Sequence, residues 1–261
     1  MELNLDRKRA LVMSAGGGLG SAIAVALARE GVEVCLADRD VSSIDAVQAA
    51  VHQVGGRSRT YVWDLGKQDE WQAGISKMLA DVGGIDILVN NTGGPPPGPA
   101  HGHDCDVWRN AFESMVISVI GITDLLLPGM RDRGWGRIIT STSSGVVSPI
   151  ANLGLSNATR VSLLGWSKTL AREVARWGIT SNVVIPGRIA TGRTQFLDAA
   201  RAKREGRDVK NVQEESESTI ASGRYGRPEE YADVVTFLAS ERASYVTGST
   251  IRVDGGLIAS I

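Results

Sequence analysis

Short apolar runs alternate with longer amphipathic stretches along the whole chain, and this alternation constrains the fold more than any other feature. We expect strands at residues 10–13, 32–37, 60–63, 85–89, 137–140, 180–184 and 249–253, and helices at residues 21–30, 43–54, 70–82, 106–130, 155–177 and 229–239. Apolar strands that alternate with helices are typical of a parallel sheet covered on both faces. Since crossovers between parallel strands are right-handed, the sequence predicts an α/β fold with a single doubly wound parallel sheet of about seven strands.

No linker divides the 261 residues, so we expect one domain spanning residues 1–261. Two segments interrupt the alternation. Residues 93–99 contain four of the eight prolines and predict a stiff loop, and residues 192–222 are charged and irregular. Loops that follow the strands of a doubly wound sheet lie at its carboxyl edge, where ligands bind. We therefore expect residues 192–222 to form a substrate lid, with a solvated surface insertion as the alternative.

Charge and cysteine content exclude several classes of protein. The net charge of −1 gives no electrostatic footprint for nucleic acid or for an anionic membrane. Two cysteines, Cys35 and Cys105, cannot form a disulfide framework. The first residues lack the apolar core of a signal peptide, and we expect no apolar run near the ~18–20 residues that cross a bilayer. We expect a cytoplasmic protein with no nucleic-acid or membrane partner.

A glycine-rich turn follows the first predicted strand and opens the first helix. It contains Ser14, Gly16, Gly17, Gly18, Leu19 and Gly20. Such a turn lets the backbone approach a pyrophosphate, which then lies at the helix N-terminus. Asp38 ends the second strand, 18 residues after Gly20, where a carboxylate accepts hydrogen bonds from ribose hydroxyls. Asp38 would repel a 2′-phosphate, whereas Arg39 would attract it. The sequence therefore predicts a dinucleotide cofactor, with NAD preferred over NADP.

Further motifs follow in an order that resembles the short-chain dehydrogenase/reductase family, close to its 3-oxoacyl-carrier-protein reductase-like branch. Residues 14–20, 64–65, 90–93, 182–191, 226–230, 245–248 and 253–256 carry the resemblance, which covers nearly the whole chain. It implies a Rossmann-type sheet. It also implies that Asp64 and Leu65 lie near the adenine, that Asn91 and Gly93 lie beside the adenosine ribose, and that the nicotinamide half contacts Pro186, Gly187, Ile189 and Thr191.

The catalytic residues depart from the family pattern, which has Asn, Ser, Tyr and Lys. The resemblance assigns the serine to Ser143, and the tyrosine should lie 13 residues later, where the chain has Ser156. Arg160 replaces the lysine and Met115 the asparagine. A serine hydroxyl is a far weaker acid than a phenol, and arginine stays protonated. Arginine can still hold a carboxylate, a phosphate or a ribose oxygen. We take Ser143, Ser156 and Arg160 as the candidate catalytic residues, with Ser143 polarising the substrate oxygen.

Two histidines offer another proton donor. His101 and His103 follow the proline-rich loop, at the edge where a substrate would enter, although exposed loop histidines are the commoner case. We expect no metal site, because alternating ligands on one loop lack a distant second pair. Asp104 or Asp106 is expected to cap the following helix.

These observations predict an atypical short-chain dehydrogenase/reductase, an NAD(P)(H)-dependent oxidoreductase of a small carbonyl or alcohol substrate. Two alternatives remain open at this point. One is a catalytically silent NAD(P)-binding homologue. The other is a non-redox protein similar to the halohydrin dehalogenases, which also carry arginine for lysine but keep the tyrosine and lose the glycine-rich site. The resemblance also implies a homo-oligomer, a tetramer or dimer, built on helices 106–130 and 155–177, where Trp166 and Trp177 lie either in the interface or in the core.

Overall fold

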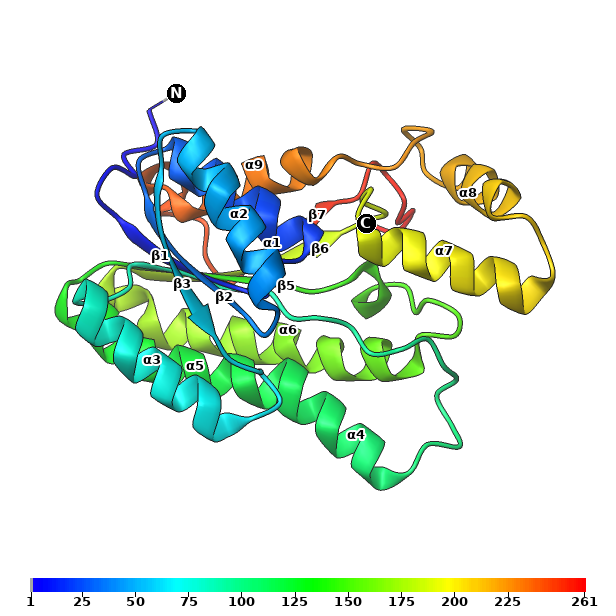
Figure 1. Ribbon diagram of the computed structural model, residues 1–261, viewed down its shortest axis with the longest axis horizontal. Helices are drawn as coiled ribbons and strands as arrows, with labels where there is room; N and C mark the ends of the chain where they lie inside the picture. Colours follow the sequence, from blue (N-terminus) through cyan, green and yellow to red (C-terminus); the bar gives the residue numbers. More distant parts are fainter. Residues whose placement is uncertain (1) are drawn as a thin grey trace.

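Seven parallel strands form one sheet in the computed structural model, which describes residues 2–261. The strand order is β3-β2-β1-β4-β5-β6-β7, and the helices cover both faces (Figure 1). The strands are β1 (Arg9–Met13), β2 (Glu33–Asp38), β3 (Arg57–Val62), β4 (Ile87–Asn90), β5 (Gly136–Ser141), β6 (Ile179–Pro186) and β7 (Thr250–Val253). The predicted doubly wound parallel sheet is confirmed.

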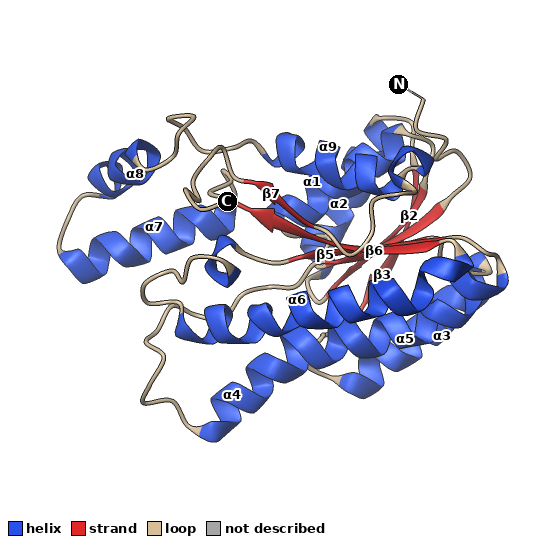
Figure 2. Cartoon of the chain, turned by 180° about the vertical axis from the view of Figure 1, so that it is seen from behind, coloured by secondary structure: helices blue, strands red, loops and turns tan. Residues whose placement is uncertain are grey.

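Two layers of helices enclose the sheet, as Figure 2 shows from the other side. One layer contains α1 (Gly18–Arg29), α2 (Val41–Gln53) and α9 (Pro228–Ala239), and the other contains α3 (Gln68–Val82), α4 (Cys105–Phe112), α5 (Ser118–Asp132) and α6 (Gly154–Val174). Side chains alternate along β1, so that Ala10 and Val12 join the first core, and Leu11 and Met13 the second. Trp166 and Trp177 are partly buried against this second core.

The charged segment 192–222 was expected to be irregular, and that prediction was wrong. It forms α7 (Gly192–Glu205) and α8 (Val209–Ser218), which extend beyond the sheet on the side of β7 (Figure 1). Thr191 caps the start of α7, and Gly206 ends it at a φ of 63°. Arg201 of α7 pairs with Glu205 of the same helix at 2.9 Å and also with Glu215 of α8, and the second ion pair joins the two helices. Ion pairs replace the apolar periodicity that would have revealed these helices in the sequence.

The long helix expected at residues 106–130 is interrupted. A π-helical turn, Glu113–Ile117, separates α4 from α5. Asp104 occupies the N-cap position of α4, but its carboxylate makes no capping hydrogen bond, and Asp106 instead binds Arg109 at 2.6 Å. The predicted aspartate cap is therefore absent from α4.

By length and composition alone, the continuous helical segment Cys105–Asp132 could cross a membrane. This finding corrects our expectation that the chain contains no such segment. Helices in the core of folded proteins have the same length and composition, and 44% of the most apolar part of this segment is buried in the protein. Its inner side packs with α3 and α6 in the second core.

Candidate functional site

The glycine-rich turn is fixed by contacts to the strands beside it. Asn91, which follows β4, donates from Nδ2 to the carbonyl oxygens of Met13 and Ser14, at 3.3 Å each. A Cβ on Gly20 would lie 2.3 Å from the Ser14 oxygen, and a Cβ on Gly18 would lie 2.8 Å from Cγ2 of Thr191. Only glycine fits at these positions, because a larger residue would displace the turn.

The N-terminus of α1 is open for a phosphate. Gly17 occupies the N-cap position without a side chain, and the first turn contains no acidic residue. Within residues 2–261, the amides of Gly18 and Leu19 donate to no protein acceptor. Free amides at a helix N-terminus together with close-approach glycines fit the pyrophosphate of a dinucleotide. The residues present therefore match the cofactor that the sequence predicts.

Asp38 lies beside this turn at the end of β2. Its Oδ2 accepts a hydrogen bond from the Gly16 amide at 3.0 Å, and its Oδ1 accepts one from the Arg39 amide at 2.7 Å. The Arg39 side chain points instead toward Asp64, 3.9 Å away. A second, open surface cavity on this side is lined by Arg39, Asp40, Val62, Trp63, Asp64, Lys67 and Glu70. Leu65 packs against the second core rather than into this cavity.

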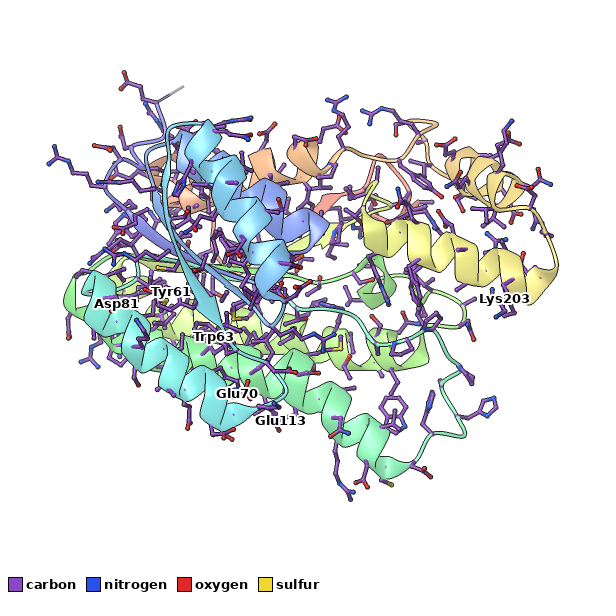
Figure 3. All side chains as sticks on the ribbon, viewed as in Figure 1. Tyr61, Trp63, Glu70, Asp81, Glu113 and Lys203 are labelled. Atoms are coloured by element: carbon purple, nitrogen blue, oxygen red, sulfur yellow. The ribbon has the colours of Figure 1, made fainter. Side chains whose placement is uncertain are left out.

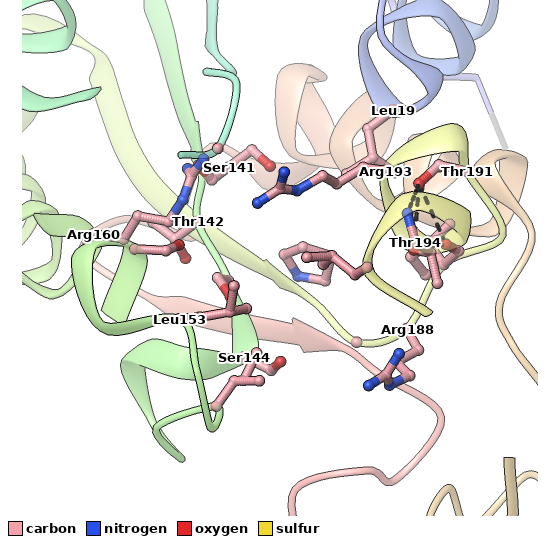
Figure 4. Close-up of a pocket in the computed structure, with 18 of the residues that line it drawn as sticks. Leu19, Ser141, Thr142, Ser144, Leu153, Arg160, Arg188, Thr191, Arg193 and Thr194 are labelled. Carbon is pink, nitrogen blue, oxygen red and sulfur yellow. Dashed lines mark hydrogen bonds between the residues drawn. The ribbon is translucent and has the colours of Figure 1, made fainter. Parts of the chain in front are cut away.

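The main cavity, of about 480 Å³, opens at the carboxyl ends of the central strands (Figure 4). It joins the glycine-rich turn to the candidate catalytic residues. The predicted site residues that line it are Ser14, Gly17, Gly18, Leu19, Asn91, Gly93, Ser143, Ser156, Arg160, Pro186, Gly187, Ile189 and Thr191. The predicted residues Gly16, Gly20, Asp38, Arg39, Asp64 and Leu65 lie outside it.

Several hydroxyl groups line this cavity near the end of β5. Ser143 Oγ accepts a hydrogen bond from the Gly145 amide at 3.2 Å, which leaves its own proton available for a ligand. Ser156 lies in the first turns of α6 and is 6% exposed. The buried hydroxyls of Thr92 and Thr142 find no partner in the described part of the chain. Neither threonine was predicted as a site residue from the sequence. The only signal for Thr92 is that it replaces the alanine of the family's Asn-Asn-Ala-Gly motif, which residues 90–93 resemble.

Arg160 is buried and holds the loop after β4. Its Nη2 donates to the carbonyl oxygens of Thr92 at 3.0 Å and of Gly93 at 2.8 Å, and its Nη1 lies 3.4 Å from the Ser141 oxygen. Burial lowers the pKa of Arg160 to about 10, and the positive charge of Arg193 contributes to the shift. Arg160 therefore fixes the loop that carries Gly93.

Other residues considered as proton donors or metal ligands lie elsewhere. Met115 is buried in the π-helical turn, with its Sδ 3.7 Å from Oγ1 of Thr159. His103 Nε2 lies 2.9 Å from the Pro99 oxygen, and His101 is exposed; neither lines the main cavity. Across residues 2–261, no three His, Cys, Asp or Glu side chains group as a metal site would require.

Helix α7 forms one wall of the cavity with Arg193, Thr194 and Leu197. Asp198 of the same helix, which is 1% exposed, accepts a hydrogen bond from Arg188 at 2.7 Å and another from Tyr225 at 2.9 Å. These contacts attach α7 to the segments on either side of it. Sequence reasoning missed Arg188 and Arg193, because nothing local marks an arginine as cavity-lining.

Comparison with known proteins agrees with this geometry. The family described as enoyl-(acyl carrier protein) reductase matches residues 14–258. The 3-oxoacyl-(acyl-carrier-protein) reductase FabG of Escherichia coli (strain K12) is 34% identical over 258 residues, which cover 98% of this chain and 99% of that protein. Dehydrogenase/reductase SDR family member 4 of Bos taurus is 33% identical over 260 residues, covering 98% of this chain and 89% of that protein.

A solved structure shows the same likeness in three dimensions. The L-sorbose reductase of Gluconobacter frateurii, complexed with NADPH and L-sorbose, has a TM-score of 0.94 and 31% sequence identity, with all of both chains covered. The match therefore extends over the sheet, both helical layers and the cavity wall. This chain belongs to the short-chain dehydrogenase/reductase family of NAD(P)-dependent oxidoreductases and is similar to its FabG-like members.

Proposed function

We propose that this protein is an atypical NAD(P)(H)-dependent oxidoreductase that interconverts a small carbonyl compound and its alcohol. One observation carries the proposal: a single cavity joins the open N-terminus of α1 to the hydroxyls of Ser143 and Ser156. A cofactor whose pyrophosphate lay at Gly17 to Leu19 would therefore extend toward the two serines. Family members with this fold include L-sorbose reductase and NAD⁺-bound xylitol dehydrogenase, whose names indicate carbonyl and alcohol substrates.

The roles of the cavity residues follow from their chemistry. The nicotinamide supplies or accepts the hydride when it is bound. Ser143, with its proton free, donates a hydrogen bond to the substrate oxygen. Ser156 stands at the position of the family's tyrosine and Arg160 at that of its lysine, so we assign to Ser156 the proton that accompanies hydride transfer. Arg160 holds the loop after β4 in place beside the nicotinamide half.

The cofactor preference is proposed to be NAD over NADP. The Asp38 carboxylate is fixed against the glycine-rich turn by the Gly16 amide. The cavity beside it contains three acidic and two basic residues, and each basic side chain pairs with an acid, Arg39 with Asp64 and Lys67 with Glu70, so that the cavity and Asp38 together carry a net negative charge. A 2′-phosphate would therefore meet a negative surface.

Two structural roles belong to the same proposal. Helices α7 and α8 serve as the substrate lid, since Leu197 of α7 and Thr219, which directly follows α8, both line the cavity. The outer faces of α4, the π-helical turn, α5 and α6 form a homo-oligomer interface, because they expose Phe112, Ile117, Leu125 and Val161. Large apolar side chains on one face indicate a partner surface. Light scattering tests this directly: an oligomer that Val161→Asp converts to monomer is expected, and a monomeric wild-type protein would refute the interface.

A second candidate function is nucleotide binding without turnover. It is favoured by the titratable groups that line the main cavity: within residues 2–261 these are three arginines, with no Tyr, Lys, His, Asp or Glu. Arginine is a poor proton donor at neutral pH. Such a protein would act as a sensor or as the silent partner of an active homologue.

The two functions are separated by measuring binding and hydride transfer on the same sample. Calorimetry with NADH and NADPH should show tighter binding of NADH. Mixing the NADH-loaded protein with a panel of ketones, aldehydes and sugars should then bleach the NADH absorbance. Binding without bleaching on any substrate supports the silent protein, and failure to bind either nucleotide overturns both.

A further inference from the structure

Three arginines line the main cavity, and only one of them is neutralised. Arg188 pairs with the buried Asp198 at 2.7 Å. Arg160 and Arg193 donate hydrogen bonds only to carbonyl oxygens, and the Arg193 guanidinium also lies over the Phe196 ring, 5.6 Å from its centroid; neither arginine has a carboxylate partner among residues 2–261. Charges that are removed from water without a counter-ion are costly. The cavity therefore holds an excess of positive charge that a ligand can compensate.

Arg193 is the more available of the two uncompensated groups. It lies in the first turn of α7, is partly buried, and uses one N–H group to donate to the Pro95 oxygen at 2.6 Å. Its remaining N–H groups donate to no protein acceptor within residues 2–261. Figure 4 shows its side chain crossing the cavity toward the side where Arg160 lies. Burial lowers the pKa of both arginines, and each would be stabilised by a nearby anion.

The position of Arg193 distinguishes between two sources of negative charge, the cofactor phosphates and the substrate. Phosphates are expected at the amides of Gly18 and Leu19. The Arg193 guanidinium instead lies against the loop after β4, where a Cβ on Gly94 would be 2.9 Å from Nη2. This is the loop that Arg160 holds through Gly93, and Arg160 also lies 3.4 Å from the Ser141 oxygen, so both guanidinium groups lie near the end of β5 that carries the candidate catalytic hydroxyls. The geometry thus favours a substrate group.

We propose that the substrate carries a carboxylate in addition to its carbonyl or alcohol, and that Arg193 binds this carboxylate and determines specificity. A planar guanidinium with free N–H groups suits the two oxygens of a carboxylate. Arg160 remains on its loop carbonyls and adds a second positive charge nearby. This inference rests on the proposed function, because it assigns the substrate of the same cavity.

The test uses oxo acids of increasing length and their uncharged esters. Pyruvate, acetoacetate and levulinate, each beside its methyl ester, are titrated by calorimetry into the full-length protein with and without NADH. At least one acid should bind roughly ten- to a hundredfold more tightly than its ester, as expected for hydrogen bonds to a charged group. Arg193→Gln should abolish this preference, and Arg193→Lys should retain part of it.

Lys203→Gln provides a matched control for charge. Lys203 is an exposed residue on the outer part of the same helix (Figure 3), so its replacement removes one positive charge without changing the cavity. This variant should keep the full preference for the acid. NADH affinity is measured for every variant, because Arg193→Gln should leave it unchanged.

Three results would overturn the proposal. In the first, no acid is preferred over its ester by the wild-type protein. In the second, the preference survives in Arg193→Gln or is lost equally in Lys203→Gln. In the third, Arg193→Gln weakens NADH binding and leaves the preference intact, which would assign the guanidinium to a cofactor phosphate. Failure of the proposed function would give a different result, namely that the wild-type protein does not bind NADH. The titrations without NADH would then still measure whether the acid binds more tightly than its ester.

Discussion

Replacing Asp38 by asparagine removes a negative charge beside the expected 2′ position of the adenosine ribose, with little change in shape. The asparagine oxygen can still accept the hydrogen bond that the Gly16 amide gives to Asp38 at 3.0 Å. The turn should therefore persist while the repulsion of a 2′-phosphate disappears.

The size of the effect follows from Coulomb's law. Two unit charges about 4 Å apart interact by about 1 kcal/mol in water and by about 4 kcal/mol at an effective dielectric constant near 20. Asp38 is partly exposed, so the lower half of this range applies. We expect the ratio of the NADPH and NADH dissociation constants to shift toward NADPH by about 1–2 kcal/mol, roughly five- to thirtyfold.

Calorimetry with both nucleotides on both proteins measures this ratio. Asp45→Asn is the matched control, because Asp45 is an exposed residue of α2 that lines neither cavity. The reasoning would be refuted if the ratio were the same in the wild-type protein and Asp38→Asn, or if Asp45→Asn shifted it equally.

Three further predictions concern catalysis and stability. Arg160→Met should lower the free energy of unfolding by about 1–2 kcal/mol in urea titrations: the loop carbonyls that Arg160 binds lose their donors, and removal of the buried charge offsets part of that loss. An unchanged value would contradict the role of Arg160 in holding the loop. Ser156→Tyr combined with Arg160→Lys should raise the rate of NADH-dependent carbonyl reduction by about a hundredfold or more, which is the usual contribution of a positioned general acid. No gain in rate would show that the cavity does not align a substrate with residue 156. The hydrogen bond from Arg224 lowers the pKa of Glu230 from 4.5 to about 2. The stability that ionised Glu230 contributes is therefore complete above pH 4.5 and is lost as the pH falls toward 2. The melting temperatures of the wild-type protein and Glu230→Gln should converge over that interval, and a constant difference would exclude this linkage.

Local patterns in the sequence were sufficient for most of the fold. Buried strands such as β1 and β4 are short apolar runs, so their positions follow from composition alone. The start of β3 was missed because this edge strand begins with polar residues, Arg57 to Arg59, of which two are exposed. The helices α7 and α8 were missed for a related reason: they are held by ion pairs such as Arg201 with Glu205, which leave no apolar stripe.

The nucleotide end of the candidate site was also accessible from the sequence, because its glycines and Asp38 act through backbone geometry within one βαβ unit. The contacts at the catalytic end of the site could not be predicted from the sequence. Arg160 donates to the loop carbonyls of Thr92 and Gly93, contacts that nothing in the sequence around Arg160 indicates. Thr142, whose buried hydroxyl lacks a partner in the described chain, carries no local signal at all.

The sequence by itself thus determined the parallel sheet, the family and the location of the glycine-rich turn, since periodicity and motif spacing are properties of adjacent residues. Only the tertiary structure decided which charges share the cavity. Arg193 meets Pro95 across 98 residues of sequence, and Arg160 meets Gly93 across 67. Contacts between such distant segments depend on how the loops fold over the carboxyl edge of the sheet, and the charge balance of the cavity follows from that arrangement.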